Sequence, residues 1–319
     1  MEVILLLAAL FIYVLRWYTI FILSFCFVLA IPTLFTYWIA IIVCCAGFGF
    51  FSVPWFVVPV AAFGGYSAIL YNRYSYRDGS EYSGARASRW FRRLRIWRVL
   101  HWWTNFRPLN EVFQAHHPRC LFAVHPHGFL PIAILLGFAL PGCAGSIHGA
   151  VDPLIATFWI PFWIPIIRDL FLWSGGIVAD KDAMIRALNR CSVVVAPGGL
   201  HEGMLHDHHK LAFSFKHMGF LDVATKAAVP VVPVFAQGEN RLWFILPIFR
   251  ALRNQFYQFF SVPFPTIFIP FIFPHDLRLV ARHELAYPVS PKVFQKEILD
   301  LVNEFECDED IKGMIIEEK

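Results

Sequence analysis

Hydrophobic residues fill the first part of the chain almost without interruption. No charged residue occurs from Trp17 to Tyr71, a run of about 55 residues where one membrane-spanning helix needs about 20. Pro32 and Pro54 divide this run into pieces of spanning length. The pattern predicts a transmembrane helical hairpin within residues 1–72. A third apolar piece that spans, re-enters or lies at the interface remains open.

Arginines and aromatic residues alternate in the next segment, residues 73–104. The arginines are Arg73, Arg77, Arg86, Arg89, Arg92, Arg93, Arg95 and Arg98. Positive charge beside a membrane span faces the cytoplasm, and interleaved tryptophans are typical of a segment that lies on the bilayer surface. A solvated linker helix explains the same pattern. A nucleic-acid partner is not predicted, because the basic residues adjoin membrane spans.

Buried strands and amphipathic helices alternate over residues 105–319. Strand-like apolar runs occupy residues 119–124, 191–195 and 229–237. Helical periodicity marks residues 181–190, 220–228 and 291–311. This alternation is typical of an α/β fold with a mostly parallel sheet that is covered on both faces. We therefore expect one α/β domain after the membrane hairpin and the interfacial segment.

Composition agrees with a protein associated with membranes. The chain of 319 residues is 58% hydrophobic and 17% aromatic, and only 16% of it is charged, whereas soluble domains carry about a quarter charged residues. The net charge of +4 says little as a total. The seven cysteines show no spacing typical of zinc or redox sites, so no disulfide framework is predicted.

A rigid polar turn follows the first predicted strand of the α/β domain. It consists of His125, Pro126, His127 and Gly128. Proline has no N–H to donate and glycine permits close backbone approach, so the turn fixes the direction of its side chains. Histidine can take a proton from a hydroxyl group near neutral pH. The alternative is that both imidazoles only cap neighbouring elements.

A second polar turn, Pro197-Gly198-Gly199, follows another predicted strand and leads to Glu202. Active residues of such sheets collect at the carboxyl ends of the strands. A carboxylate there can hydrogen-bond one ring nitrogen of a histidine and leave the other as the base. Gly198 and Gly199 could offer N–H groups to an oxyanion. The alternative is an ordinary turn in which Glu202 favours a helix N-terminus.

Four blocks, in this order, resemble the type-2 diacylglycerol acyltransferase family, which includes monoacylglycerol, wax-ester and retinol-ester relatives. They read "HPHG", "RDLFLWSGGIVADKDAMIRAL", "VVVAPGGLHEGM" and "GFLDVATKAAVPVVPVFAQGEN". The resemblance implies a membrane-associated fold similar to that of the glycerolipid acyltransferases. It also implies the endoplasmic reticulum membrane as location, with the catalytic domain facing the cytosol and lipid droplets as a second site.

The resemblance implies direct transfer from acyl-CoA to a neutral lipid hydroxyl. His127 would be the general base, Glu202 would orient and stabilise the imidazolium, and His125 would shape the site, with the reverse assignment of the two histidines left open. The candidate substrate-binding residues are Gly128, Gly198, Gly199, Arg168, Lys216 and Asn240. Lys216 would meet CoA phosphates or the membrane, although the pattern favours a solvated lysine over this role. No cofactor or metal is expected, and acyl-CoA serves as co-substrate.

Departures from the family pattern affect the choice of acceptor. Asn105-Phe106-Arg107-Pro108 stands in place of a Tyr-Phe-Pro element, and Gln237 stands where phenylalanine is usual. Diacylglycerol is the first expectation, with monoacylglycerol or a long-chain alcohol as the alternative. The predicted partners are acyl-CoA, the neutral lipid alcohol and a phospholipid membrane, and a homo-oligomer stays open.

Three other functions fit parts of the sequence less well. His201, His206, His208 and His209 have the donor type of a metal site, but Leu205 breaks the zincin pattern. The Gly-x-Ser-x-Gly element of serine hydrolases is missing. A non-enzymatic lipid-droplet scaffold would explain the apolar hairpin, but it leaves the two polar turns after buried strands without a purpose.

Overall fold

The computed structural model describes most of the chain after residue 77. The described residues are 78–109, 116–128, 130–140, 152–163, 167–206, 208–245, 268–270, 276–306 and 314–317. The predicted membrane hairpin, residues 1–72, lies outside them. Among the described residues, no helix combines the length and the apolar character that crossing a bilayer requires.

Six strands form the central sheet in the order β3-β2-β4-β1-β6-β9. Their bounds are β1 Leu121–His125, β2 Leu154–Thr157, β3 Gly176–Val178, β4 Val193–Val195, β6 Val231–Gln237 and β9 Arg278–Val280. Neighbouring strands are parallel, except that β9 runs antiparallel to β6. The prediction of an α/β fold with a mostly parallel sheet is confirmed. Strands β4 and β6 lie within the predicted runs, and β1 extends one residue beyond its run, to His125.

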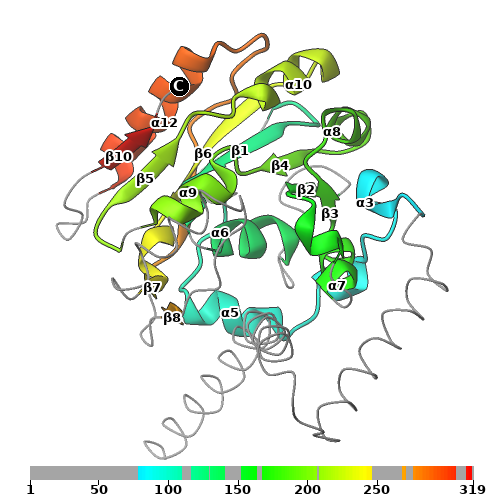
Figure 1. Cartoon of the computed structure of the whole chain (residues 1–319), viewed down its shortest axis with the longest axis horizontal. Coiled ribbons are helices and arrows are strands. Elements are labelled where there is room, and N and C mark those ends of the chain that lie inside the picture. Colours follow the sequence, from blue (N-terminus) through cyan, green and yellow to red (C-terminus); the bar gives the residue numbers. More distant parts are fainter. Residues whose placement is uncertain are drawn as a thin grey trace, which may run out of the picture.

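Helices cover both faces of this sheet (Figure 1). On one side lie α8 (Lys181–Leu188), α10 (Gly219–Ala227) and α12 (Pro291–Phe305), which match the segments of helical periodicity, with α10 beginning one residue earlier. On the other side lie α5 (Trp97–Trp103) and α6 (Ile132–Ile134), the latter continued by the π-helical turn η2 (Leu135–Ala139). The predicted burial of both faces is therefore confirmed.

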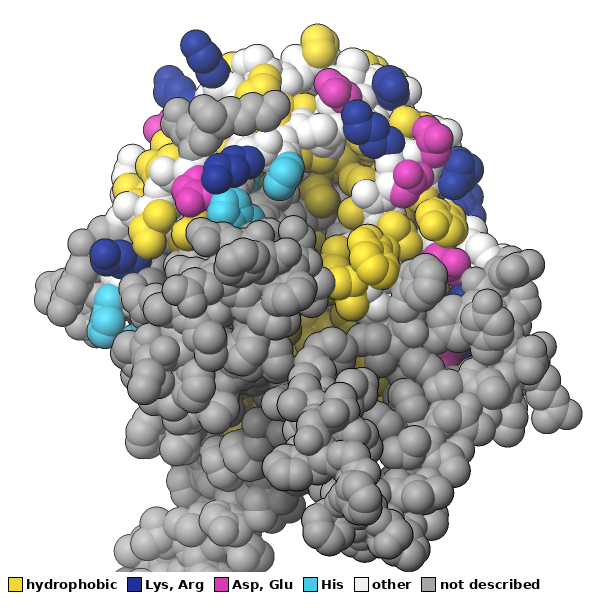
Figure 2. All heavy atoms as spheres, viewed as in Figure 1, with side chains coloured by type: hydrophobic (Ala, Val, Ile, Leu, Met, Phe, Trp, Pro, Cys, Tyr) yellow, Lys and Arg dark blue, Asp and Glu magenta, His cyan; other side chains and the backbone are white. Residues whose placement is uncertain are grey.

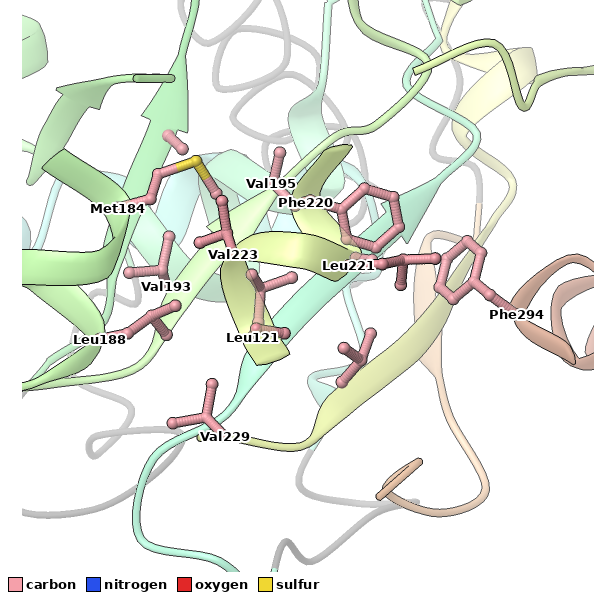
Figure 3. Packing of buried hydrophobic residues seen from close by; sticks show 14 of the residues in the cluster. Leu121, Met184, Leu188, Val193, Val195, Phe220, Leu221, Val223, Val229 and Phe294 are labelled. Carbon is pink, nitrogen blue, oxygen red and sulfur yellow. The ribbon is translucent and has the colours of Figure 1, made fainter. Parts of the chain in front are cut away.

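Alternate side chains of β1 enter two different cores. Leu121 and Ala123 pack with residues of α8, α10 and α12, in the cluster drawn in Figure 3. Phe122 and Val124 pack in a second cluster with residues of α6 and η2. A strand that is buried on both faces has no polar position, which explains the continuous apolar sequence before His125.

Short elements connect the layers and were not evident from periodicity. They are α3 (Ser80–Ser83), α4 (Arg89–Arg92), η3 (Ile160–Trp163), α7 (Ile167–Trp173), α9 (Gly199–Leu205) and η4 (Glu239–Arg241). Two small sheets pair β5 (Leu211–Ser214) with β10 (Met314–Glu317) and β7 (Trp243–Ile245) with β8 (Phe268–Pro270). Elements of three to seven residues are too short to show a period, and the central strands β2, β3 and β9 escaped prediction for the same reason.

Arg92 fastens α4 to the α/β domain. Its side chain is 2% exposed, and it donates hydrogen bonds to the carbonyl oxygens of Phe138 (2.5 Å), Ala139 (3.0 Å) and Pro153 (3.1 Å). Burial lowers the pKa of this guanidinium, and the charge of Asp152 acts in the opposite direction. The basic segment therefore contributes one arginine to the interior in addition to those at its surface.

The face of the molecule drawn in Figure 2 carries charged side chains in one part and apolar side chains in another. Charged side chains of both signs are spread over its upper part, and apolar side chains gather below them, next to the grey residues (Figure 2). Trp90 and Ile96 are among the exposed large hydrophobic residues, at 74% and 60% exposure.

Candidate active site

The two polar turns meet at the carboxyl end of the sheet, because β1 and β4 are parallel neighbours. His125 is the last residue of β1, and Glu202 lies on α9, which follows β4. Nδ1 of His125 is 2.9 Å from Oε1 of Glu202, and both side chains have 0% exposure. A carboxylate held by a histidine ring at this edge is the contact expected from the sequence, and the ring that makes it belongs to His125.

Glu202 reaches the second histidine through the backbone. The N–H group of His127 donates to Oε2 of Glu202 at 2.6 Å, and the N–H group of Ser214 donates to Oε1 at 3.2 Å. The carboxylate thus binds the end of β1, the turn beyond it and the end of β5. Its role is to hold the turn that carries His127, which differs from the expected contact with the ring of His127.

Gly198 provides the space that Glu202 occupies. A Cβ atom on Gly198 would lie 2.5 Å from both Cδ and Oε2 of Glu202, closer than nonbonded atoms approach. The N–H group of Gly199 donates to the carbonyl oxygen of Ala196 at 3.0 Å. Gly199 therefore uses its donor within the turn, and Gly198 leaves the space that the carboxylate of Glu202 fills.

The hydrogen bond and the pKa of His127 are those of a neutral imidazole. Its side chain is partly buried, and Nδ1 lies 3.0 Å from the carbonyl oxygen of Gly128. A carbonyl only accepts hydrogen bonds, so Nδ1 carries the proton and Nε2 keeps a lone pair. Burial lowers the pKa of His127, although the hydrogen bond to Gly128 and the charge of Glu202 act to raise it. The ring is therefore neutral near pH 7.

His125 faces an aromatic wall instead. The centre of its ring lies 5.4 Å from that of Phe215, 6.0 Å from that of Phe294 and 6.2 Å from that of Phe213. Its Nε2 is buried and has no hydrogen-bond partner among the described residues. His127 is thus the partly exposed histidine of the turn, whereas the Nε2 atom of His125 is enclosed.

Glu239 is a site residue that the sequence analysis did not select, although Asn240 beside it was a candidate. It follows β6, the other neighbour of β1, and has 0% exposure. Its carboxylate accepts the N–H groups of Ile132 (2.9 Å) and Ala133 (2.7 Å) at the start of α6. The available signal was the Gly-Glu-Asn at the end of the last family block, which includes Glu239 but from which only Asn240 was taken as a candidate.

Asn240 is 2% exposed and donates from Nδ2 to the carbonyl oxygen of His208 at 3.3 Å. It joins the β6 end to the segment after α9 and thus borders the site. Gly128 also lies at the site, with φ 61° and with its Cα against the Glu239 side chain. These two candidates therefore lie at the predicted edge of the sheet.

Arg168 and Lys216 have protein partners other than the two histidines. Arg168 is 4% exposed and forms ion pairs with Asp78 (3.1 Å) and Glu81 (3.0 Å), beside the outer strand β3. Lys216 lies 2.9 Å from a carboxylate oxygen of Glu317 on β10. The contacts of Arg168 are structural, joining α7 to α3, and the structure does not bring it to the histidine turn.

The histidine-rich segment after Gly199 is engaged in other contacts. Nε2 of His201 lies 3.0 Å from Nζ of Lys216 and 2.5 Å from a carboxylate oxygen of Glu317. Within the part of the chain that the structure describes, no three His, Cys, Asp or Glu side chains converge as metal ligands do. The described cysteines Cys120 and Cys191 are buried thiols.

Comparison with known proteins identifies the family. Residues 55–259 match the family model described as diacylglycerol acyltransferase, which covers more than half of the 319 residues. The chain therefore belongs to the diacylglycerol acyltransferase family, as the four sequence blocks predicted.

Individual relatives are distant. The chain is 27% identical over 216 residues to diacylglycerol O-acyltransferase 2-like protein 6 of Bos taurus, a match that covers 64% of this chain and 62% of that protein. It is 27% identical over 205 residues to 2-acylglycerol O-acyltransferase 3 of Homo sapiens, covering 61% and 59%. The chain thus spans less than two thirds of the length of these relatives. Among solved structures it is similar to the 1-acyl-sn-glycerophosphate acyltransferase PlsC of Thermotoga maritima, with 18% identity and a TM-score of 0.42, over 80% of this chain and 94% of that one.

Proposed function

We propose that this protein is an acyl-CoA-dependent O-acyltransferase that esterifies a neutral lipid hydroxyl. The observation that carries the proposal is that the carboxylate of Glu202 accepts hydrogen bonds from both the ring of His125 and the backbone N–H group of His127. A buried carboxylate that fixes a histidine turn at the carboxyl ends of parallel strands is suited to proton-transfer chemistry. Membership of the diacylglycerol acyltransferase family supports the same reaction class.

In this mechanism His127 is the general base. Nε2 takes the proton of the acceptor hydroxyl while the hydroxyl oxygen attacks the thioester carbonyl carbon. The carbon–sulfur bond then breaks, the imidazolium returns the proton to the CoA sulfur, and the ester and free CoA leave. Such assistance typically contributes about 10²–10⁴-fold to the rate, and the alignment of donor and acceptor contributes much of the rest.

His125 acts on the reaction through Glu202. Its Nδ1–H donates to the carboxylate, which in turn binds the N–H group of His127. Because the ring of His125 is enclosed by Phe213, Phe215 and Phe294, its contribution is to hold the side chain of Glu202 in place. We therefore assign the base to His127 and a positioning role to His125.

Diacylglycerol is the acceptor we propose first, with triacylglycerol as the product. The relative from Bos taurus carries the words diacylglycerol O-acyltransferase in its name. The human relative named 2-acylglycerol O-acyltransferase 3 has the same 27% identity, which keeps monoacylglycerol as the second candidate. A long-chain alcohol is the third acceptor to be tested.

We further propose that the protein works at the endoplasmic reticulum membrane, with its α/β domain on the cytosolic side and lipid droplets as a second location. The segment of α4 and α5 supports this. It exposes Trp90 (74%), Ile96 (60%) and Trp102 (47%), and the arginines Arg89, Arg93, Arg95 and Arg98 are exposed around them. Exposed tryptophans among arginines suit an interface with anionic phospholipid headgroups.

The test of the reaction uses membranes that carry the full chain at matched abundance. Radiolabelled acyl-CoA is supplied with diacylglycerol, monoacylglycerol or a long-chain alcohol, and the esters are separated. We expect wild type to form an ester with at least one alcohol and His127→Ala to lose at least about 100-fold, within the range of general-base catalysis. His283→Ala is the matched control, because His283 is an exposed histidine that faces Glu297 across 3.8 Å.

The outcomes separate the alternatives. Full activity in His127→Ala would move the base to His125 or elsewhere. A wild type that transfers acyl groups to none of the three alcohols, while present at normal abundance in the membrane, would reject the enzyme and favour a lipid-droplet scaffold.

A further inference from the structure

A second buried carboxylate, that of Glu239, contacts the histidine turn from the side opposite Glu202. It is held by η4 at the end of β6, and Gly238 before it has φ 84°, a conformation that favours glycine. A Cβ atom on Gly238 would lie 2.2 Å from the carbonyl oxygen of Asp276. The backbone that presents Glu239 is therefore fixed by its own packing.

Glu239 lies directly against the backbone of the turn. A Cβ atom on Gly128 would come within 2.8 Å of Cγ and 3.2 Å of Oε1 of Glu239. The same carboxylate accepts the N–H groups of Ile132 and Ala133. The segment from Gly128 to Ala133 is thus held at both of its ends by one side chain.

This contact bears on the proposed base, because the carbonyl oxygen of Gly128 accepts the hydrogen bond from Nδ1 of His127. A shift of Gly128 would turn that carbonyl and release the ring. Glu202 fixes the N–H group of His127, and Glu239 fixes the residue on the other side. Two carboxylates from the ends of the strands that flank β1 therefore enclose the turn.

We propose that Glu239 is a positioning residue for His127, acting through Gly128 and the start of α6. The inference rests on the proposed acyl transfer, for which it names a further residue. The surroundings of its carboxyl group also disfavour the charged form. Burial raises the pKa of Glu239 to about 8, although the N–H groups of Ala133 and Ile132 act to lower it. A buried acidic group whose hydrogen bonds come from the backbone N–H groups of Ile132 and Ala133 needs a compensating function or structural role.

Glu284 offers a matched control at the opposite end of the same strand. Its Oε1 accepts the consecutive N–H groups of His116 (2.5 Å) and His117 (3.0 Å), just before β1 begins. Glu239 likewise accepts two consecutive N–H groups, just after the turn that ends β1. Both Glu239→Gln and Glu284→Gln keep the side-chain volume and remove one carboxyl oxygen. Glu239 uses both oxygens to accept its two N–H groups, so Glu239→Gln loses one acceptor, whereas Glu284 uses one oxygen for both, which Glu284→Gln can retain.

The experiment measures kcat and the KM for acyl-CoA of both variants and of wild type in membranes. For Glu239→Gln we expect kcat to fall about 10- to 100-fold, the loss that misplacement by about 1 Å can cause, with KM changed less than about threefold. Glu284→Gln should keep the wild-type kcat. A wild-type kcat in Glu239→Gln, or an equal loss in Glu284→Gln, would overturn the proposal.

A readout without substrate separates this inference from the proposed reaction. Diethyl pyrocarbonate modifies the unprotonated nitrogen of histidine, and mass spectrometry follows its rate at His127 in each protein. Glu239→Gln should change that rate severalfold, and Glu284→Gln should leave it unchanged. If wild type proves to have no transferase activity, the proposed function fails while this comparison still decides whether Glu239 positions His127. Equal rates in all three proteins would reject the positioning role.

Discussion

Gly198 and Glu202 lie one helical turn apart, and the carboxylate of Glu202 fills the place where a side chain on residue 198 would be. The ideal Cβ position of Gly198 is 2.5 Å from both Cδ and Oε2 of Glu202. The glycine is therefore required by the site and not by backbone strain, since its φ of −68° is open to every residue type. Loss of this space would move the group that holds both histidine segments.

Gly198→Ala is accordingly expected to lower kcat at least about tenfold, because a displaced Glu202 misplaces His127. Gly219→Ala is the control. Gly219 is the first residue of α10, where an added Cβ would meet only Cε of Lys181 at 3.8 Å. Rate measurements on both variants decide the point, and normal turnover by Gly198→Ala would show that Glu202 can move without effect.

Removal of the Glu202 side chain should cost stability as well as activity. Glu202→Ala leaves three buried donors without their acceptor, on His125, His127 and Ser214, and each such loss costs about 1–3 kcal/mol. Glu202→Gln keeps one accepting oxygen and should unfold at a temperature between those of wild type and Glu202→Ala. Thermal unfolding in detergent measures the order of the three proteins. Equal midpoints would show that water satisfies these donors.

The activity should depend on pH through His127. Its base form must be neutral, and burial places its pKa below the usual 6.5. Turnover is therefore expected to be level above pH 6.5 and to fall as the pH decreases through the lower pKa of the folded protein. A rate profile at saturating acyl-CoA tests this. An acid limb centred well above pH 6.5 would assign the step to another group.

The sequence predicted the parts of the site that follow recognisable strands. The apolar run of β1 and the β-branched run of β4 are long enough to recognise, and parallel pairing then places His125 and Glu202 at one edge. The sequence did not predict which of the two histidine rings hydrogen-bonds the carboxylate of Glu202. That depends on the alternation of side chains along β1, because His125 has the orientation of Leu121 and Ala123, toward the face covered by α12.

Arg168, in contrast, has contacts that could not be predicted from the sequence. A charged residue in a family block suggested a substrate contact, but Asp78 and Glu81, about ninety positions earlier, pair with it. No local pattern reveals a partner so distant in sequence. Glu239 was missed for a related reason: its importance comes from contact with Gly128, which only the pairing of β1 with β6 creates.

The raised pKa of Glu239 predicts that the free energy of unfolding depends on pH. Its pKa is about 8 in the folded protein and near the ordinary value of 4.5 when exposed, so between these values the folded state holds a proton that the unfolded state has released. Stability contributed by this group is present below pH 4.5 and is lost as the pH rises to about 8. Glu239→Gln has no such proton, and its midpoint relative to wild type should increase over that window. A constant difference would indicate that Glu239 is ionised throughout.

Arg92 and Arg93 are adjacent arginines with opposite environments, which allows a last comparison. Arg92→Met removes the donor for three carbonyl groups, those of Phe138, Ala139 and Pro153, and should lower the free energy of unfolding by several kcal/mol, at about 1–3 kcal/mol for each buried group left unpaired. Arg93 is exposed, and its guanidinium is 3.8 Å from Asp152. Arg93→Met should therefore cost less than about 1 kcal/mol. Denaturation of the full chain in detergent gives both values. Similar losses would mean that α4 is held to the domain by its charge and not by the buried hydrogen bonds of Arg92.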